Sequence, residues 1–425
     1  MQTAAVSEKQ GFRGLIKVRS YMMYMLAQVI SRFGDSVDSI AYSWLAYTLT
    51  GSELLMGSLF AFNYLPGLIF SMFTGVFVDR WSKKLVLVLT YTGRAIFVTI
   101  TAILYAMDEL QVWHLFVITF MNSTLECFSR PAEVSLIPRL LPKEKLLTGN
   151  SFASSMSRTA ELIGISIAGA LIALLGMAGT IAIDALTFLI SAIIIAFISN
   201  PESDESPDAN KQDSHNLKTD SKSVLGDIKE ALTFIGKHSL LLTTTCLAAF
   251  INFCLTPLNV LQPVYVREIL GGGAGGMSLL GTGLLIGMIF GGLWLGNYGG
   301  RFRKSSLILF GTLLLAVGYM LMSLPAILPA MRMEVAVVSM FINGFAVTVA
   351  STPVSTYLME VTPREMLGRI GALLGVMCTA AMPLGSFLTG LAAQNSTPAI
   401  LFFVMGLLVA VPVIFLFGKK NFRAI

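Results

Sequence analysis

Long uninterrupted apolar runs constrain this 425-residue chain more than any other feature of its sequence. Runs such as 85–105, 181–198 and 399–417 each fall within the roughly 17–25 residues that a helix needs to cross a bilayer. Hydrophobic residues make up 55% of the chain and charged residues only 12%, about half the usual soluble share. The sequence therefore predicts an all-α membrane protein and excludes an ordinary soluble globule.

The apolar runs between polar breaks predict twelve transmembrane helices. They lie near 21–47, 53–78, 84–106, 112–129, 152–175, 179–198, 239–262, 277–298, 304–324, 334–358, 368–391 and 397–417. One long polar stretch divides them into two groups of six. We therefore predict an N-terminal six-helix bundle over 1–199, a cytoplasmic linker with an amphipathic helix over 200–238, and a C-terminal six-helix bundle over 239–425.

The distribution of cations indicates the orientation of the chain in the membrane. If both termini are cytoplasmic, 24 of the 29 Lys and Arg residues lie on the cytoplasmic side and two lie in outer loops. The remaining three, Arg32, Arg94 and Arg158, lie within spans. We therefore expect cytoplasmic termini, and we assign the net charge of +5 to orientation rather than to a nucleic-acid partner.

An internal repeat relates the two halves of the chain. The pattern G-x-x-x-D-R-x-x-K-K begins at Gly75, and a similar G-x-x-x-G-R-x-x-K begins at Gly296, 221 residues later. Gly164 and Gly385 are related by the same offset. Because each half contains an even number of spans, the two copies have parallel topology.

These features resemble the major facilitator superfamily over nearly the whole chain. The loop after the second span resembles the signature of that family, and it departs from it at Ser82, where glycine is usual. The resemblance implies the major facilitator fold, with two parallel six-helix repeats. It also implies that this loop acts as a conformational latch facing the eleventh span. The latch residues are Gly75, Asp79, Arg80, Lys83 and Lys84.

Within that superfamily, three stretches resemble the bacterial drug and macrolide efflux, or secretion-effector, branch. These stretches are 31–35, 131–150 and 368–386. The resemblance implies secondary active transport by alternating access in a bacterial cell membrane. One departure is Ile165, which follows Gly164 where the efflux branch often has proline.

Ionisable residues at membrane depth crowd into the first six spans, and such residues are costly enough to indicate function. Gln28, Arg32, Asp35 and Ser39 share one helical face near the middle of the first span. A carboxylate there must pair or take up a proton, as a proton-coupling site requires. The proton-coupling candidates are Asp35, Glu126, Glu161, Arg32 and Arg158.

An alternative for these charges is a static role as ion pairs between or along helices. We keep it open above all for Asp184 and Glu126, and Asp38 is compatible with a simple continuation of the polar face. Spacing predicts three pairs within helices. They are Arg32 with Asp35, Glu126 with Arg130, and Arg158 with Glu161.

Uncharged polar residues in the spans are candidates for a substrate path. They are Asn63, Asn122, Asn252, Thr256, Asn259 and Asn343. The alternative is that they hold helices together, as polar residues in membranes often do. The glycines of 287–291 and 292–296 predict close helix packing.

These observations favour a proton-coupled exporter of amphipathic drugs or macrolide-like compounds. The alternatives are a dedicated exporter of one endogenous metabolite, such as a siderophore or peptide, and an uptake permease. A scaffold would need a larger soluble surface than the linker offers. A membrane enzyme would need a polar catalytic cluster, and the three histidines are scattered at His114, His215 and His238.

We expect no cofactor and no metal site, because nucleotide-binding, metalloprotease and hydrolase motifs are absent from the sequence. The expected partners are an amphipathic small molecule, protons and the lipid bilayer. We expect the chain to act as a monomer.

Overall fold

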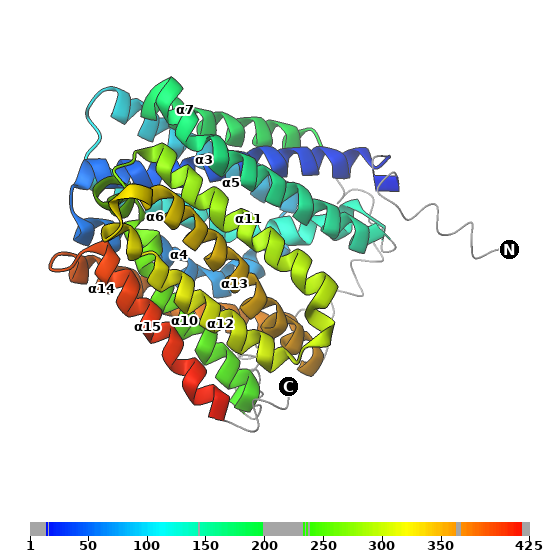
Figure 1. Cartoon of the computed structure of the whole chain (residues 1–425). Helices are drawn as coiled ribbons and strands as arrows, with labels where there is room; N and C mark the ends of the chain where they lie inside the picture. Colours follow the sequence, from blue (N-terminus) through cyan, green and yellow to red (C-terminus); the bar gives the residue numbers. More distant parts are fainter. Residues whose placement is uncertain are drawn as a thin grey trace. The chain divides into compact units, whose positions relative to one another are not determined.

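The computed structural model of the chain describes residues 14–15, 17–142, 145–198, 233, 235–236, 239–362 and 367–418. These residues are mostly helical, and no strand occurs among them. The long helices are α3 (Arg19–Thr50), α4 (Glu53–Arg80), α5 (Lys83–Ala106), α6 (Val112–Leu140), α7 (Leu146–Ala196), α10 (Ser239–Val264), α11 (Ala274–Tyr298), α12 (Lys304–Leu321), α13 (Arg332–Val361), α14 (Leu367–Ala393) and α15 (Pro398–Gly418) (Figure 1). Short helices are η2 (Tyr265–Ile269), η3 (Gly299–Arg301), η4 (Leu324–Ala326) and η5 (Pro329–Met331).

The predicted division of the chain into twelve spans is confirmed over the described residues. Ten of the long helices each match one span, and α7 matches two because Gly176 interrupts it. Gly176 has φ 71° and ψ 178°, a conformation that favours glycine, and it separates the arms 146–175 and 177–196. The linker and the predicted amphipathic helix over 224–238 fall largely outside the described residues.

Two of the long helices differ from the others in how polar they are. Nine described helices are long and apolar enough to cross a membrane, with α7 taken as one, and α3 and α6 are not among them. Both carry several charged side chains at mid-helix positions, including Asp35 in α3 and Glu126 in α6. The α3 and α6 helices therefore place charged groups at mid-helix depth in the first half of the chain.

The α6 helix is longer than the sequence predicts. The predicted fourth span ends at 129, just before Pro131, whereas the helix continues through Pro131 and Pro138 to Leu140. Proline is tolerated within membrane helices because neighbouring groups satisfy the freed backbone. The extension places Glu133 within the helix rather than in a loop.

The chain divides into two compact units. Of the described residues, 14–49 and 65–198 belong to the first unit, while 50–64 and those from 233 onward belong to the second. The start of α4 packs on α14 within the second unit, since a side chain at Gly57 would meet the Ser386 carbonyl oxygen at 2.5 Å.

Equivalent glycines of the repeat permit equivalent helix contacts in the two units. A Cβ at Gly164 on α7 would lie 2.8 Å from the Phe33 carbonyl oxygen on α3. A Cβ at Gly385 on α14 would lie 2.6 Å from Thr256 Oγ1 on α10. Such short distances exclude a larger side chain without movement. Both halves of the sequence repeat therefore use a glycine to bring two helices together.

The predicted close packing at 287–291 is also present. A Cβ at Gly287 on α11 would overlap the Phe341 carbonyl oxygen on α13, and one at Gly291 would lie 2.9 Å from the Phe345 carbonyl oxygen. In contrast, a Cβ at Gly292 would have no neighbour within 4 Å among the described residues. Only the first of the two glycine pairs is at a tight helix crossing.

Candidate functional site

A cavity of about 680 Å³ lies within the first unit, among α3, α6 and α7. The predicted polar face of α3 forms one wall, because Gln28, Arg32, Asp35 and Ser39 all line the cavity. Helical spacing of i, i+4, i+7 and i+11 aims these four side chains the same way. The cavity gives the charged groups of α3 a shared space that admits solvent and solutes.

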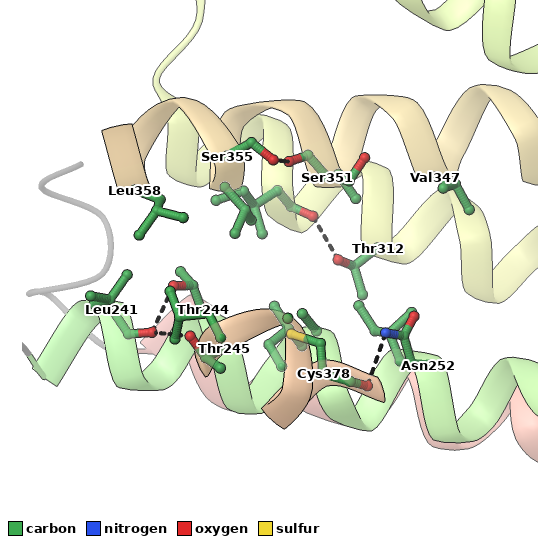
Figure 2. Close-up of a pocket in the computed structure, with 18 of the residues that line it drawn as sticks. Leu241, Thr244, Thr245, Asn252, Thr312, Val347, Ser351, Ser355, Leu358 and Cys378 are labelled. Carbon is green, nitrogen blue, oxygen red and sulfur yellow. Dashed lines mark hydrogen bonds between the residues drawn. The ribbon is translucent and has the colours of Figure 1, made fainter. Parts of the chain in front are cut away.

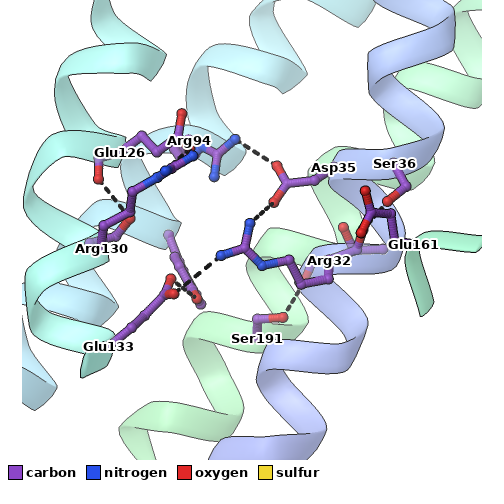
Figure 3. Close-up of polar contacts among 12 residues, drawn as sticks. Arg32, Asp35, Ser36, Arg94, Glu126, Arg130, Glu133, Glu161 and Ser191 are labelled. Atoms are coloured by element: carbon purple, nitrogen blue, oxygen red, sulfur yellow. Dashed lines mark hydrogen bonds and ion pairs between the residues drawn. The ribbon is translucent and has the colours of Figure 1, made fainter. Parts of the chain in front are cut away.

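Asp35 lies between two guanidinium groups (Figure 3). Arg94 on α5 donates from Nη2 to Asp35 Oδ1 at 2.7 Å. Arg32, one turn earlier on α3, places Nη1 4.0 Å from Asp35 Oδ2. The predicted Arg32–Asp35 pair is therefore present, and its carboxylate makes its closer ion pair with α5.

Glu133 on α6 completes this arrangement and was not a sequence candidate. It accepts from Arg32 Nη2 at 3.3 Å and from the Tyr91 hydroxyl at 3.0 Å, one bond on each carboxylate oxygen. The Tyr24 hydroxyl donates to the Glu133 backbone carbonyl at 3.4 Å. Glu133 is buried and also borders the cavity. Arg32 thus bridges two carboxylates, Asp35 and Glu133.

Arg94 is the second residue of the site that was not chosen as a candidate. Its guanidinium lies over the Phe188 ring at 4.1 Å from the centroid, which adds a cation–π contact to its ion pair. Its Nε is buried and has no hydrogen-bond partner among the described residues. The sequence could have indicated Arg94, because it is a lone cation inside an apolar run. It could not have indicated Glu133, because that residue lay beyond the predicted end of its span.

Two further acids lie in the electrostatic surroundings of Asp35 and Arg94. Asp38 interacts with both charges, and Asp184 interacts with Asp38, Asp35 and Arg94. Asp184 is buried on α7 and accepts from the Thr187 hydroxyl at 3.4 Å. These three carboxylates share the field of Arg94 with Glu126 and Glu133, which makes the cluster sensitive to the protonation of any one of them.

The other two predicted pairs are present as well. Arg130 donates to Glu126 Oε1 from Nε at 2.9 Å and from Nη2 at 2.6 Å. Arg158 donates to Glu161 Oε2 at 2.8 Å. Both arginines are well exposed, and they line the cavity together with Glu161. The cavity wall therefore carries both positively and negatively charged side chains.

The predicted latch residues fall partly outside the described side chains. Those of Gly75, Asp79 and Arg80 are not described, so the latch contact stays a prediction. Lys83 is buried, and Lys84 donates to the Ile198 carbonyl at 2.7 Å, near the C-terminal end of α7.

Ser82, the departure from the family pattern, has a structural role of its own. Its hydroxyl caps α5 by accepting from the Leu85 amide at 3.4 Å. The loop between α4 and α5 is thus anchored at the start of α5 by a capping hydroxyl.

A second cavity, of about 300 Å³, lies within the second unit among α10, α12, α13 and α14. Of the predicted substrate-path residues, only Asn252 lines it. Thr256 is buried, lies 3.5 Å from the Thr389 hydroxyl and packs between helices, while Asn259 is exposed. The predicted α10 stripe therefore divides between a cavity wall, a helix interface and an exposed position.

The remaining asparagine candidates lie in different settings. Asn343 is buried against Gly318, and neither side-chain polar atom has a partner among the described residues. Asn122 Oδ1 is likewise buried without a partner in the described part of the chain, and Asn63 is exposed. None of these three lines either cavity.

The arrangement supports ion pairing, proton exchange and small-molecule binding. Among the described residues, no group of three His, Cys, Asp or Glu side chains could hold a metal ion. The cavity in the first unit is lined by charged side chains and by serine hydroxyls. Its chemistry is that of charges buried in a membrane helix bundle.

A membrane transporter is the class of protein that two helical repeats and a buried charge cluster define. The chain belongs to the Major Facilitator Superfamily, whose family model matches residues 24–271 and 241–423. It is therefore a multi-pass membrane transporter of small molecules.

Relatives of known name include exporters. The chain is 23% identical to macrolide efflux protein A of Streptococcus pyogenes, over 89% of this chain and 90% of that protein. It is 24% identical to the multidrug efflux pump Tap of Mycolicibacterium fortuitum, over 87% and 88% of the two chains.

Solved structures share the fold at low sequence identity. One variant of the nucleoside transporter NupG aligns with a TM-score of 0.75 at 12% identity, covering 95% of this chain and 99% of that one. A bacterial homologue of the iron transporter ferroportin, in an inward-facing state, aligns with a TM-score of 0.70 at 15% identity over 94% and 99%. These likenesses establish the fold alone.

Proposed function

We propose that this transporter exports amphipathic drug-like compounds, macrolides among them, in exchange for protons. The observation that carries the proposal is Asp35, a carboxylate at mid-span that borders the cavity and is held by two guanidinium groups. The bacterial relatives named as efflux proteins support export across a bacterial cell membrane, and the 24 cations on one side support cytoplasmic termini.

The network around Asp35 gives a proton a way to alter helix contacts. When Asp35 is ionised, it attracts Arg94 on α5 and Arg32 on its own helix. A proton on Asp35 removes that attraction, and Arg32 then pairs with Glu133 on α6 alone. The balance of ion pairs on α3 thereby moves from α5 towards α6, and such a shift biases the equilibrium between two arrangements of these helices.

The mixed wall of the cavity is consistent with an exchange of solutes. Asp35 is 24% exposed, so water in the cavity can deliver or remove its proton. The exposed Arg158–Glu161 pair borders the same space and presents both signs of charge to an entering molecule. In this proposal Asp35 is the primary site of protonation, because it borders the cavity between two guanidinium groups. Glu161 and Glu126, each paired with one exposed arginine, are secondary sites.

Transport by the reconstituted protein tests the proposal. Proteoliposomes with an imposed proton gradient are expected to accumulate ethidium and erythromycin, and a protonophore is expected to abolish this accumulation. In Asp35→Asn, gradient-driven accumulation is expected to be lost while downhill movement of ethidium persists. Glu334→Gln, at an exposed acid in the first turn of α13, is the matched control and is expected to behave as wild type.

Two results would contradict the proposal. Accumulation by wild type that survives the protonophore would exclude proton coupling. Accumulation by Asp35→Asn that still depends fully on the gradient would remove Asp35 from the coupling site.

A further inference from the structure

The cavity of the second unit differs in chemistry from the charged cavity of the first. Leucine, isoleucine, valine and alanine side chains form most of its walls. No carboxylate, ammonium or guanidinium group occurs among the described side chains that line it. At about 300 Å³ it has the size of a small-molecule site, with a few polar groups set in an apolar wall.

Four of the five hydroxyl groups that line this cavity share one property. Their hydrogens are used by backbone carbonyls, as the dashed lines in Figure 2 show. Thr244 and Thr245 both donate to the Leu241 carbonyl, at 3.0 and 2.8 Å. Thr312 donates to the Ile308 carbonyl at 2.7 Å, and Ser355 donates to the Ser351 carbonyl at 3.2 Å.

This use of hydrogens determines what the wall can offer a ligand. A hydroxyl whose hydrogen is held by a carbonyl presents only its oxygen lone pairs. Asn252 is held in a similar way, because its Nδ2 donates to the Cys378 carbonyl at 3.1 Å and its Oδ1 is an acceptor. Among the described groups, the Ser351 hydroxyl and the second hydrogen of Asn252 Nδ2 are the donors left over. The wall therefore offers more acceptors than free donors.

We propose that this cavity binds the uncharged apolar part of the exported compound and selects parts that carry an O–H or N–H donor. The inference rests on the proposed export function and specifies the chemistry of its substrate. A ligand that offers only acceptors would leave the wall oxygens without partners, whereas a donor would satisfy one of them. Net hydrogen bonds of about 1 kcal/mol correspond to about a fivefold preference for the donor.

Cys378 provides a reporter at this site, since its side chain belongs to the cavity wall. In the full chain with Cys127, Cys246 and Cys254 replaced by alanine, the rate of alkylation of Cys378 by N-ethylmaleimide reports access to the cavity. The probes are 1-naphthol, which has a donor, and 1-methoxynaphthalene, which has only an acceptor. Leu384→Cys, combined with Cys378→Ser, supplies a control thiol on the same helix, where the side chain is 58% exposed.

We expect 1-naphthol to slow the alkylation of Cys378 by at least about fivefold and to leave the thiol at position 384 unaffected. We expect 1-methoxynaphthalene to need about fivefold higher concentration for the same protection. Thr312→Val, which keeps the shape and removes one acceptor, is expected to reduce that preference. Ala248→Trp fills the cavity from α10 and is expected to abolish protection.

Several results would overturn the inference. Equal slowing of both thiols would show general partitioning into the micelle. Equal potency of the two probes would remove donor selection, and a Cys378 thiol that never reacts would show that solutes do not reach the cavity. If Cys378 is not protected while ethidium export still depends on the proton gradient, the inference fails and the proposed function stands. If 1-naphthol protects Cys378 but ethidium is not exported by the proton gradient, the binding chemistry of the cavity stands and the proposed function fails.

Discussion

The ion pair between Asp35 and Arg94 provides a quantitative test of the buried network. The atoms are 2.7 Å apart, and the side chains are 24% and 15% exposed. Removing one partner of a fully buried pair costs about 3–5 kcal/mol. Because Asp35 borders the cavity and Arg32 partly compensates its charge, we expect Arg94→Met and Asp35→Asn each to lose about 2–3 kcal/mol of unfolding free energy.

A double-mutant cycle isolates the pair from the other contacts of Arg94, such as its position over Phe188. The assay is unfolding by SDS in mixed micelles, followed by tryptophan fluorescence. We expect the double variant to lose less than the sum of the single losses, with a coupling energy of about 1.5–2.5 kcal/mol.

The Arg158–Glu161 pair is the matched control for this cycle. Its atoms are 2.8 Å apart, almost the same distance, but its side chains are 65% and 32% exposed. Exposed pairs within one helix contribute about 0.3–0.5 kcal/mol. If the two cycles give coupling energies within about 0.5 kcal/mol of each other, then burial does not strengthen the Asp35 pair and the reasoning is refuted.

Three further predictions follow from single contacts. Glu133→Gln keeps the Tyr91 hydrogen bond but loses the charge that attracts Arg32, so the pH dependence of ethidium transport in proteoliposomes should change while the protein stays folded; an unchanged profile would contradict this. In the same SDS assay, Gly287→Ala should lower the free energy of unfolding by about 2 kcal/mol or more, because the added methyl group overlaps α13. Gly292→Ala has open space around it and should leave the free energy of unfolding unchanged or raise it slightly. Ser82→Ala should cost about 0.5–1 kcal/mol by the same measurement and Ser82→Gly only a few tenths, because glycine also suits a helix start.

Much of the fold follows from the sequence because the bilayer sets the length of each span. Every predicted span has a described helix, or an arm of α7, at its position. The error in α6 arose because Pro131 suggested a helix end, although proline is compatible with a membrane helix. Glu133, two residues after Pro131, was therefore expected in a loop and was not chosen as a candidate.

The candidate site was only partly predictable for a different reason. Helical spacing placed Gln28, Arg32, Asp35 and Ser39 on one face, and all four line the cavity. Spacing within a helix says nothing about which neighbouring helix lies opposite. The pairing of Asp35 with Arg94, 59 residues away, and of Arg32 with Glu133, 101 residues away, depends on that arrangement and appears only in three dimensions.

The glycine that interrupts α7, Gly176, has a mechanical consequence. Gly176 joins an arm that carries Glu161 at the cavity to an arm that carries Phe188 beneath Arg94, without a loop between them. Because the connection is one residue long, a tilt of one arm moves the other arm as well, whereas a longer loop would allow the two arms to move separately. Because its φ is positive, a bulkier residue there would strain the connection even though the space around it is open. A few glycines inserted after position 176 would form a flexible linker between the two arms. The arm at the cavity wall would then move independently of the arm that contacts Arg94.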